Sequence, residues 1–357
     1  MTQDWSSFIT QQGAREDAEH FGEPAAELAA ARNGTVIAPL PDFGLIRASG
    51  DDTAAFLHNL LTNDIKNLGP DAVRYAGLCT AKGRLIASFH IWHDHNDDLL
   101  LMLSADILPG ILKKLSMYVL RSKVKLTDAT GERILIGVAG PQAEAMMLDL
   151  GALMPFPMQA VPCDNGQVIR LDELRFVLSI EPAPAQAVWT KLAAKARPVG
   201  SAAWRWLEIA AGQPRIVADT QEAFVPQMAN LETPAVGGVS FTKGCYPGQE
   251  IVARAQYLGK IKRHMYRAAL GTAAVPGTHV YAPETADQHC GEIATVAPSP
   301  EGGYECLVVV QSSCVEAGEV HIGAPDGPRL RFLTLPYAVG CCASSSSPGG
   351  VIRTIRW

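Results

Sequence analysis

The sequence predicts an α+β fold that ends in a small β-barrel, and three observations support this. Between residues 35 and 264, strand-like runs come in hairpins mixed with helical segments, which is typical of α+β layers. Neither a G-x-G-x-x-G nor a G-x-x-x-x-G-K-[S/T] motif is present, which argues against a nucleotide-binding parallel sheet. After about Arg263, several short strands follow at roughly 8–12-residue spacing, separated by Gly, Pro and Asp, as in a small barrel.

The chain divides into four expected segments. Residues 1–34 are expected to form a polar N-terminal helical segment, and residues 35–264 an α+β region of two interleaved subdomains. Residues 265–337 carry the barrel strands. Residues 338–357 are rich in Ser and Gly and fit no pattern, so we interpret them as a low-complexity tail outside the fold.

Within the α+β region the elements can be assigned in order. Strands at 35–38 and 44–48 lead to a helix that Asp51 or Asp52 can N-cap and that runs to about Leu61. A hairpin follows, with its turn at 81–84 between strands at 75–80 and 85–92. Further strands are expected at 99–103, 123–127, 133–138, 168–171 and 175–180, and helices at 106–120, 141–150, 184–195 and 201–211.

The composition is that of an ordinary globular protein. Hydrophobic residues make up 48% of the chain, and 30 Lys and Arg against 36 Asp and Glu give a net charge of −6. The chain therefore has no overall attraction to nucleic acid or to an anionic membrane. Its longest apolar run, Leu99–Leu103, is far shorter than the ~20 residues that cross a bilayer. The N-terminus carries no recognisable secretory or transit signal, so we expect a cytoplasmic protein.

Eight cysteines are present, and their spacing predicts reduced thiols and no metal site. Cys245 has unusual neighbours: it lies between Gly244 and Gly248, two residues from Lys243, just before a helix expected from Gln249. A nearby cation and a helix N-terminus both favour the thiolate form. The alternative is a buried structural cysteine in a glycine turn, and the residues alone leave both readings open.

Glu208 is a candidate ligand-binding carboxylate. At helical spacing it shares a face with Trp204, Leu207 and Ala211, and a carboxylate among apolar groups needs a partner. The pterin ring of folate offers two adjacent N–H donors that a carboxylate can accept together. The alternative is that Glu208 reaches water or pairs with an arginine, such as Arg205 or Arg215.

The segment Phe224–Leu231 places two amides, Gln227 and Asn230, on a loop shaped by Pro226. Amides both donate to and accept from a heterocycle, so these two side chains are candidate ligand contacts.

A basic stretch covers residues 254–267 and contains no acid. It could hold a polyglutamate tail or RNA phosphates, or it could be a solvated charged face. Its cations are Arg254, Lys260, Lys262, Arg263 and Arg267.

Together these segments resemble the YgfZ family of folate-binding proteins. The motif K-G-C-Y-x-G-Q-E starts at Lys243, and F-x-P-Q-x-x-N-L starts at Phe224. F-L-x-x-x-L-T-N-D starts at Phe56, and K-G-R stands at Lys82. The resemblance spans about residues 41–267.

That family is similar in fold to the aminomethyltransferase of the glycine cleavage system. The resemblance implies a ring-like folate-binding fold of ferredoxin-like subdomains with a C-terminal β-barrel. It implies tetrahydrofolate, or a folate derivative, as cofactor, with Glu208 of W-L-E-I-A-A-G holding the pterin. It also makes Cys245 the reactive thiol, with Lys243 tuning its charge. The other expected cofactor contacts are Gln227, Asn230, Tyr246, Gly248, Gln249 and Arg254.

One departure separates this chain from the transferase. Ala87 and Ser88 stand where the transferase carries acidic residues, one of them catalytic, so aminomethyl transfer by that mechanism is not expected. The resemblance implies support of iron–sulfur cluster assembly or repair, and thereby of iron–sulfur-dependent tRNA modification, with iron–sulfur enzymes or assembly factors as partners. A folate-dependent one-carbon transferase or demethylase acting on a small amine is the alternative. A binding module that docks through the basic stretch is the third reading.

Overall fold

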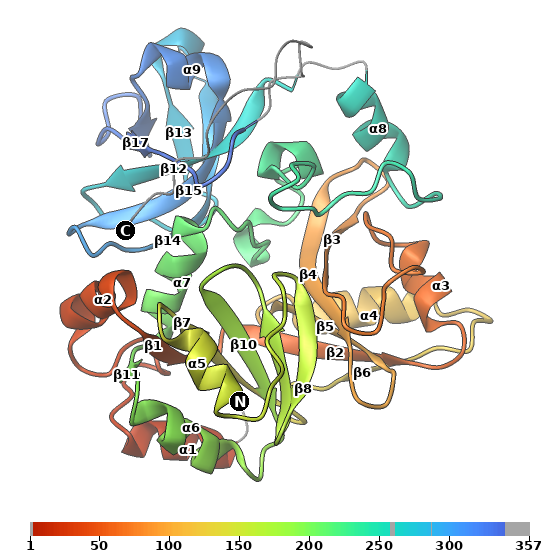
Figure 1. Ribbon diagram of the computed structural model, residues 1–357. Helices are drawn as coiled ribbons and strands as arrows, with labels where there is room; N and C mark the ends of the chain where they lie inside the picture. Colours follow the sequence, from red (N-terminus) through yellow and green to blue (C-terminus); the bar gives the residue numbers. More distant parts are fainter. Residues whose placement is uncertain (1–2, 258–260, 287, 340–357) are drawn as a thin grey trace, which may run out of the picture.

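The structure is a computed structural model that describes residues 3–257, 261–286 and 288–339. Its strands form three sheets of five, six and six strands, with helices packed on their faces (Figure 1). The predicted α+β class is confirmed. Apart from its first two residues, the expected tail at 338–357 lies outside the described residues. Within the described part of the chain, no helix is long and apolar enough to cross a membrane.

The first sheet is antiparallel, with strand order β3-β4-β5-β2-β6. Alternate residues of β4, such as Phe89 and Ile91, point to one face, where α3 and α4 cover them. The predicted turn at 81–84 closes the hairpin: the backbone N–H of Thr80 donates to the carbonyl of Arg84 at 2.8 Å. The elements are β2 (Phe43–Ser49), α3 (Thr53–His58), β3 (Arg74–Cys79), β4 (Leu85–His93), β5 (Leu99–Ser104), α4 (Leu108–Tyr118) and β6 (Lys125–Asp128).

The second sheet has strand order β11-β1-β7-β10-β9-β8, and all its pairs are antiparallel except β1 with β11. Three helices, α1, α5 and α6, bury their apolar residues against one face, while α2 and α7 lie on the other side. The elements are α1 (Gln3–Gln11), α2 (Pro24–Asn33), β1 (Val36–Pro39), β7 (Ile134–Ala139), α5 (Ala143–Leu148), β8 (Gln159–Cys163), β9 (Gly166–Arg170), β10 (Arg175–Ile180), α6 (Ala185–Ala193), β11 (Arg197–Pro198) and α7 (Ser201–Ala210).

The C-terminal sheet is antiparallel and curled, as predicted for a small barrel, with strand order β16-β13-β14-β15-β12-β17 (Figure 1). One face encloses its own apolar core, and the other packs on α7, chiefly through β14 and β15. The elements are β12 (Arg263–Leu270), β13 (His279–Tyr281), η3 (Pro283–Thr285), β14 (His289–Pro298), β15 (Tyr304–Gln311), α9 (Ser312–Ala317), β16 (His321–Ile322) and β17 (Arg331–Leu333).

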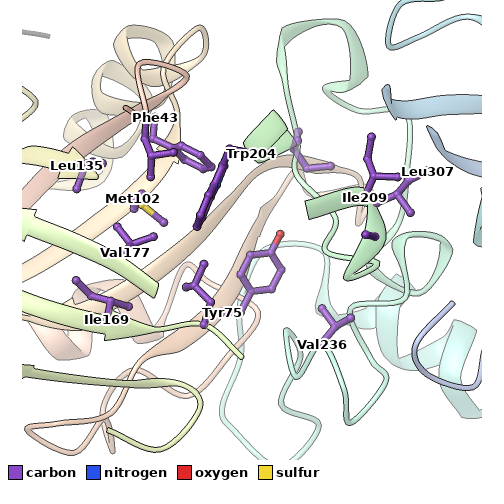
Figure 2. Close-up of a cluster of buried hydrophobic side chains, with 14 of the residues drawn as sticks. Phe43, Tyr75, Met102, Leu135, Ile169, Val177, Trp204, Ile209, Val236 and Leu307 are labelled. Atoms are coloured by element: carbon purple, nitrogen blue, oxygen red, sulfur yellow. The ribbon is translucent and has the colours of Figure 1, made fainter. Parts of the chain in front are cut away.

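The three sheets share one central core, to which α7 also contributes. Figure 2 shows this core, with Tyr75 and Met102 from the first sheet, Val177 from the second and Leu307 from the third. Gly137 of β7 shows how tightly α7 is seated, because a Cβ atom there would lie 2.5 Å from the indole of Trp204. The remaining helical segments are η1 (Ala218–Thr220), η2 (Pro226–Ala229) and α8 (Gln249–Tyr257).

Two local details differ from the sequence prediction. Strands β8 and β11 were not expected, because β8 contains Pro162 and β11 is only two residues long. The helix expected to run to Leu61 ends at His58. Asp52 occupies its N-cap position without a capping bond, because its carboxylate accepts the backbone N–H of Lys123 at 2.7 Å instead. A tertiary contact has therefore replaced a local one.

Candidate functional site

The Cys245 loop, defined as residues 237–248, is docked on the segment that follows α3. Thr62 donates its hydroxyl to the carbonyl of Gly238 at 2.6 Å, and the amide of Asn63 donates to the carbonyl of Gly237 at 2.7 Å. Both side chains are buried, so water does not compete with these bonds. The L-T-N-D motif therefore holds the loop that carries Cys245.

Lys243 fastens the same loop to the end of α3. Its ammonium group donates to the carbonyl of Leu61 at 2.6 Å and to that of His58, and it lies 4.7 Å from the centre of the Tyr246 ring. Burial lowers the pKa of Lys243 to about 8, although the charges of Asp64 and Cys245 act in the opposite direction. The ammonium group thus anchors the loop and also interacts electrostatically with Cys245.

Cys245 itself is exposed, as the reactive-thiol reading requires. The close approach of two loops sets its position. Gly248 has φ +81°, and a Cβ atom there would lie 2.6 Å from the Cα of Gly83 in the K-G-R turn. Only glycine allows this contact, and α8 begins directly afterwards at Gln249. The sequence thus places an exposed thiol four residues before a helix.

A histidine and a carboxylate lie beside the Cys245 loop. Nδ1 of His58 is 3.0 Å from Oδ1 of Asp64, and the side chain of Asn67 donates to Asp64 at 2.7 Å. The bond from Asn67 is the largest of the effects that lower the pKa of Asp64. Nε2 of His58 faces Gly244, at 3.8 Å from where a Cβ atom would stand. A Cys, a Lys, a His and an Asp therefore gather at one place.

The two amides of the F-x-P-Q-x-x-N-L segment serve the backbone. Asn230 is fully buried with φ +57°, donates to the carbonyl of Met265 at 2.8 Å and accepts its N–H at 3.3 Å. Gln227 donates to the carbonyl of Val252 at 2.7 Å, and its Oε1 has no partner among the described residues. Asn230 therefore clamps β12 and Gln227 clamps α8, so both amides have a structural role, and their expected contact with a ligand stays a prediction.

Glu208 lies on α7 and is only 5% exposed. Of the two arginines that the sequence offered as partners, Arg215 is the one in contact, with 3.6 Å between Nη2 and Oε2 of Glu208. Arg205 pairs with Glu19 and Asp42 instead. Burial raises the pKa of Glu208, while the nearby Arg215 acts to lower it. Glu208 therefore lies in the interior, and its long ion pair with Arg215 is the main interaction that offsets the cost of burying its charge.

Several other buried polar side chains lie near Glu208, and each has at least one polar atom without a partner among the described residues. Among the described residues no hydrogen bond reaches Oε2 of Glu208, Nε and Nη1 of Arg215, or Nη1 of Arg175. The same holds for Nε2 of His90 and for the side-chain nitrogen of Gln213. Such orphaned atoms are rare in folded proteins, so their concentration indicates a ligand site. We call these five side chains, together with Tyr75 and Ser88, the central cluster.

Strand alternation explains why this cluster forms. On β4, Ser88 and His90 point away from the outer apolar layer of Phe89, and on β10, Arg175 points away from that of Phe176. The His90 ring lies 4.8 Å from the Tyr75 ring. Burial, reinforced by the charge of Arg175, lowers the pKa of His90 to about 3, so its ring is neutral at physiological pH.

A cleft of about 700 Å³ reaches the cluster at Arg215. It lies between the end of β5 and the C-terminal sheet, and its volume is in the range of small-molecule sites. Thr295 also lines it and has a buried hydroxyl without a partner among the described residues. The cleft thus gives Arg215 access to the space outside the core.

Comparison with known proteins assigns the family. A family model described as the GCVT N-terminal domain matches residues 4–235. A protein named tRNA-modifying protein YgfZ from Sodalis glossinidius (strain morsitans) is 31% identical over 314 residues, covering 84% of this chain and 92% of that protein. One of the same name from Escherichia coli O7:K1 (strain IAI39 / ExPEC) is 30% identical over 325 residues, covering 88% and 97%. This chain belongs to the YgfZ family.

A solved structure agrees with the fold expected for a YgfZ family member. The glycine cleavage system aminomethyltransferase T from Bartonella henselae superposes with a TM-score of 0.78 at 19% identity, covering 94% of this chain and 97% of that one. The predicted aminomethyltransferase-type fold is confirmed.

The YgfZ family motifs meet at the Cys245 loop, although they are far apart in the sequence. The K-G-R turn touches Gly248 through Gly83, and the side chain of Arg84 donates to the carbonyl of Ala223 at 2.6 Å, next to the F-x-P-Q-x-x-N-L segment. Tyr246 is buried against Lys243, whereas Gln249 is half-buried and Arg254 exposed. Gly248 and Tyr246 therefore shape the loop, and neither lies in the central cluster.

The basic stretch of this YgfZ family member is smaller than its sequence suggests. Arg267 is paired with Glu305, with 2.6 Å between Nη2 and Oε2. Arg263 is half-buried, and Lys260 lies outside the described residues. Arg254 and Lys262 remain as the two exposed cations in the described part of the stretch.

Sequence reasoning missed four residues of interest. His90 and Arg175 belong to the central cluster, and His58 and Asp64 lie beside the Cys245 loop. The alternation of Ser88, His90 and Trp92 with apolar residues along β4 is the one signal that could have indicated an inward-facing His90. Arg175 and His58 carried no comparable signal.

Proposed function

We propose that the protein binds tetrahydrofolate in the central cluster and supports tRNA modification through iron–sulfur-dependent enzymes, acting in the cytoplasm. The observation that carries the proposal is the set of buried polar atoms without partners around Glu208. A protein retains such atoms when a ligand completes their hydrogen bonds.

The chemistry of these atoms fits a folate. The carboxylate of Glu208 accepts from two adjacent N–H groups, which the pterin ring offers through its amino group and ring nitrogen. Arg215, in contact with Glu208, has two free N–H groups that suit a carbonyl oxygen, which the pterin carries next to that nitrogen. Tyr75 and its neighbours in the shared core supply the apolar surface that a flat ring needs.

Cys245 gives the second part of the proposal. It is exposed on a loop held by Lys243, Thr62 and Asn63, so the thiol is accessible while its surroundings are fixed. An accessible thiol beside a lysine is suited to contact a metal–sulfur species or a partner's thiol. Iron–sulfur enzymes or their assembly factors are therefore the proposed partners. The two relatives named above carry the words tRNA-modifying in their names, which supports the link to tRNA.

The test uses cells that lack their own family member and measures an iron–sulfur-dependent tRNA modification by mass spectrometry of nucleosides. We expect the wild-type chain to restore the modification, and Glu208→Gln and Cys245→Ala each to reduce it at least tenfold. The matched control is Cys163→Ala, which removes a half-buried thiol from β8. Full restoration by Cys245→Ala at equal protein level would overturn the role of the thiol.

The rival function, aminomethyl or one-carbon transfer to or from a small amine, makes a different forecast. Ala87 and Ser88 provide no carboxylate on β4. We therefore expect no ammonia release from an aminomethyl carrier in the presence of tetrahydrofolate and purified protein. Steady ammonia release that is lost in Glu208→Gln would replace the proposed function with transferase activity.

A further inference from the structure

We propose that His90 and Arg175 recognise the substituent on N5 of a folate bound in the central cluster. They select folates that carry a carbonyl oxygen there, such as 5-formyltetrahydrofolate. The inference rests on the proposed folate site and adds which folate form that site prefers. Neither residue belongs to a motif of the family resemblance.

The geometry gives both residues a free polar atom in the core. His90 is 6% exposed and Arg175 is 4% exposed, and Nε2 of His90 and Nη1 of Arg175 have no hydrogen-bond partner among the described residues. Each is otherwise fixed in place. Nε of Arg175 donates to Asp172 at 2.7 Å, and the His90 ring packs on Tyr75 at 4.8 Å. Both side chains are therefore held in position, and each keeps one polar atom free to bind a ligand.

The two residues lie within the electrostatic reach of Glu208. Arg175 acts on the pKa of Glu208 and also on that of His90, so one guanidinium group links both carboxylate and imidazole. Tyr75, which contacts His90, has a pKa that burial raises most and that Glu208 and Arg215 also influence. Glu208, Arg175 and His90 thus form one electrostatically coupled group in the core.

The edge of a pterin ring has a fixed order of groups. It presents the 2-amino group, N3–H, the 4-oxo oxygen and then N5. When a carboxylate holds the two donors, a guanidinium next to it meets the 4-oxo oxygen, and the group beyond the guanidinium meets N5 and its substituent. In the proposed pose Glu208 takes the two donors, Arg215 in contact with it takes the 4-oxo oxygen, and we assign Arg175 and His90 to the N5 end.

The charges decide which substituent fits. The side chains at this end are cationic or neutral: Arg175 carries a positive charge, His90 is neutral, and Ser88 has no charge. A cationic iminium on N5 would lie beside the guanidinium of Arg175, whose partner Asp172 is already engaged in an ion pair, and this is unfavourable. A carbonyl oxygen on N5 would instead accept from the free Nη1–H of Arg175 and, in the tautomer with the proton on Nε2, from His90. A methyl group of similar size would leave those donors unsatisfied.

Calorimetry with purified protein tests the inference with three probes: tetrahydrofolate, 5-formyltetrahydrofolate and 5-methyltetrahydrofolate. We expect wild-type protein to bind the formyl form at least about tenfold more tightly than the methyl form, which corresponds to the cost of leaving one buried donor unsatisfied. We expect His90→Leu to bring that ratio below about threefold while the Kd for tetrahydrofolate changes less than threefold. His90→Gln, which keeps a donor, should retain part of the preference and serves if the leucine variant does not fold.

His93→Leu is the matched control, because it lies on the same strand with the opposite facing and contacts Asp97. It should keep the full ratio. Equal binding of the formyl and methyl forms by wild-type protein, or an unchanged ratio in His90→Leu, would overturn the inference while leaving the folate site intact. Failure of all three folates to bind would overturn the proposed function as well.

Discussion

The central cluster and the Cys245 loop differ in whether their polar groups have hydrogen-bond partners. In the central cluster, Glu208, Arg215 and His90 are buried and keep atoms without partners among the described residues. In the Cys245 loop, the supporting side chains Lys243 and Asn63 donate to backbone carbonyls, and the thiol is exposed.

This difference separates two kinds of functional region. Unmet buried hydrogen-bonding groups are costly, and a ligand that completes them gains the corresponding binding energy. A fully bonded loop gains nothing of that kind from a ligand, but it presents one reactive group in a fixed position. We therefore expect substitutions in the cluster to change affinity, and substitutions in the loop to change stability or thiol chemistry.

The largest effect is expected for Glu208→Gln. The substitution keeps the shape but replaces one acceptor oxygen by a donor, so tetrahydrofolate binding should weaken by about 2–4 kcal/mol. Calorimetry measures the change. Glu232→Gln is the control, since Glu232 also has a partnerless oxygen among the described residues but lies outside the cluster. Equal affinity of Glu208→Gln and wild type for tetrahydrofolate would contradict the central cluster as the folate site.

Asn230→Ala should act on stability alone. It removes two hydrogen bonds to Met265 and puts alanine at a left-handed backbone position, so the free energy of unfolding should fall by about 2–4 kcal/mol. Urea denaturation measures this, with the exposed Asn33→Ala as control. Loss of folate affinity at unchanged stability would instead make Asn230 a ligand contact, as the family resemblance implies.

Lys243 should make stability depend on pH. Its pKa is about 8 in the folded protein, where burial disfavours the charge, and about 10.4 when unfolded. Between these values the unfolded state binds more protons, so the free energy of unfolding should rise with pH. We expect wild type to gain stability between about pH 8 and 10 relative to Lys243→Met in parallel urea titrations. If the difference in the free energy of unfolding between the two proteins does not change across this window, the pKa of Lys243 is not lowered in the folded protein.

The smallest effect is expected for Cys245→Ala. An exposed thiol contributes little packing, so the free energy of unfolding should change by less than about 0.5 kcal/mol. Cys79→Ala, in the shared core, should cost about 1–2 kcal/mol. In wild type at pH 7, iodoacetamide should modify Cys245 before the five other described cysteines, as mass spectrometry can follow. Slow labelling of Cys245, together with a large loss of stability in Cys245→Ala, would instead show that Cys245 is a structural cysteine.

Much of the local structure could be predicted from the sequence. The hairpin turn at Gly83, the helix after Gly248 and the curled sheet after Arg263 follow from glycine positions and strand spacing, and each is present. The roles of Asn230 and Lys243 could not be predicted, because their partners lie 35 and more than 180 residues away in the sequence. Nothing near an amide in the chain indicates whether it will meet a ligand or a distant backbone.

The sequence by itself determined the family, the order of the elements and the residue types at the two sites, because motifs and periodicity are properties of neighbours along the chain. Only the tertiary structure decided that Arg215 and not Arg205 contacts Glu208, and that His90 and Arg175 join them. The physical reason is that these residues come from different strands and helices. Their meeting depends on how sheets pack around a shared core, and packing selects one arrangement from many that local preferences allow equally.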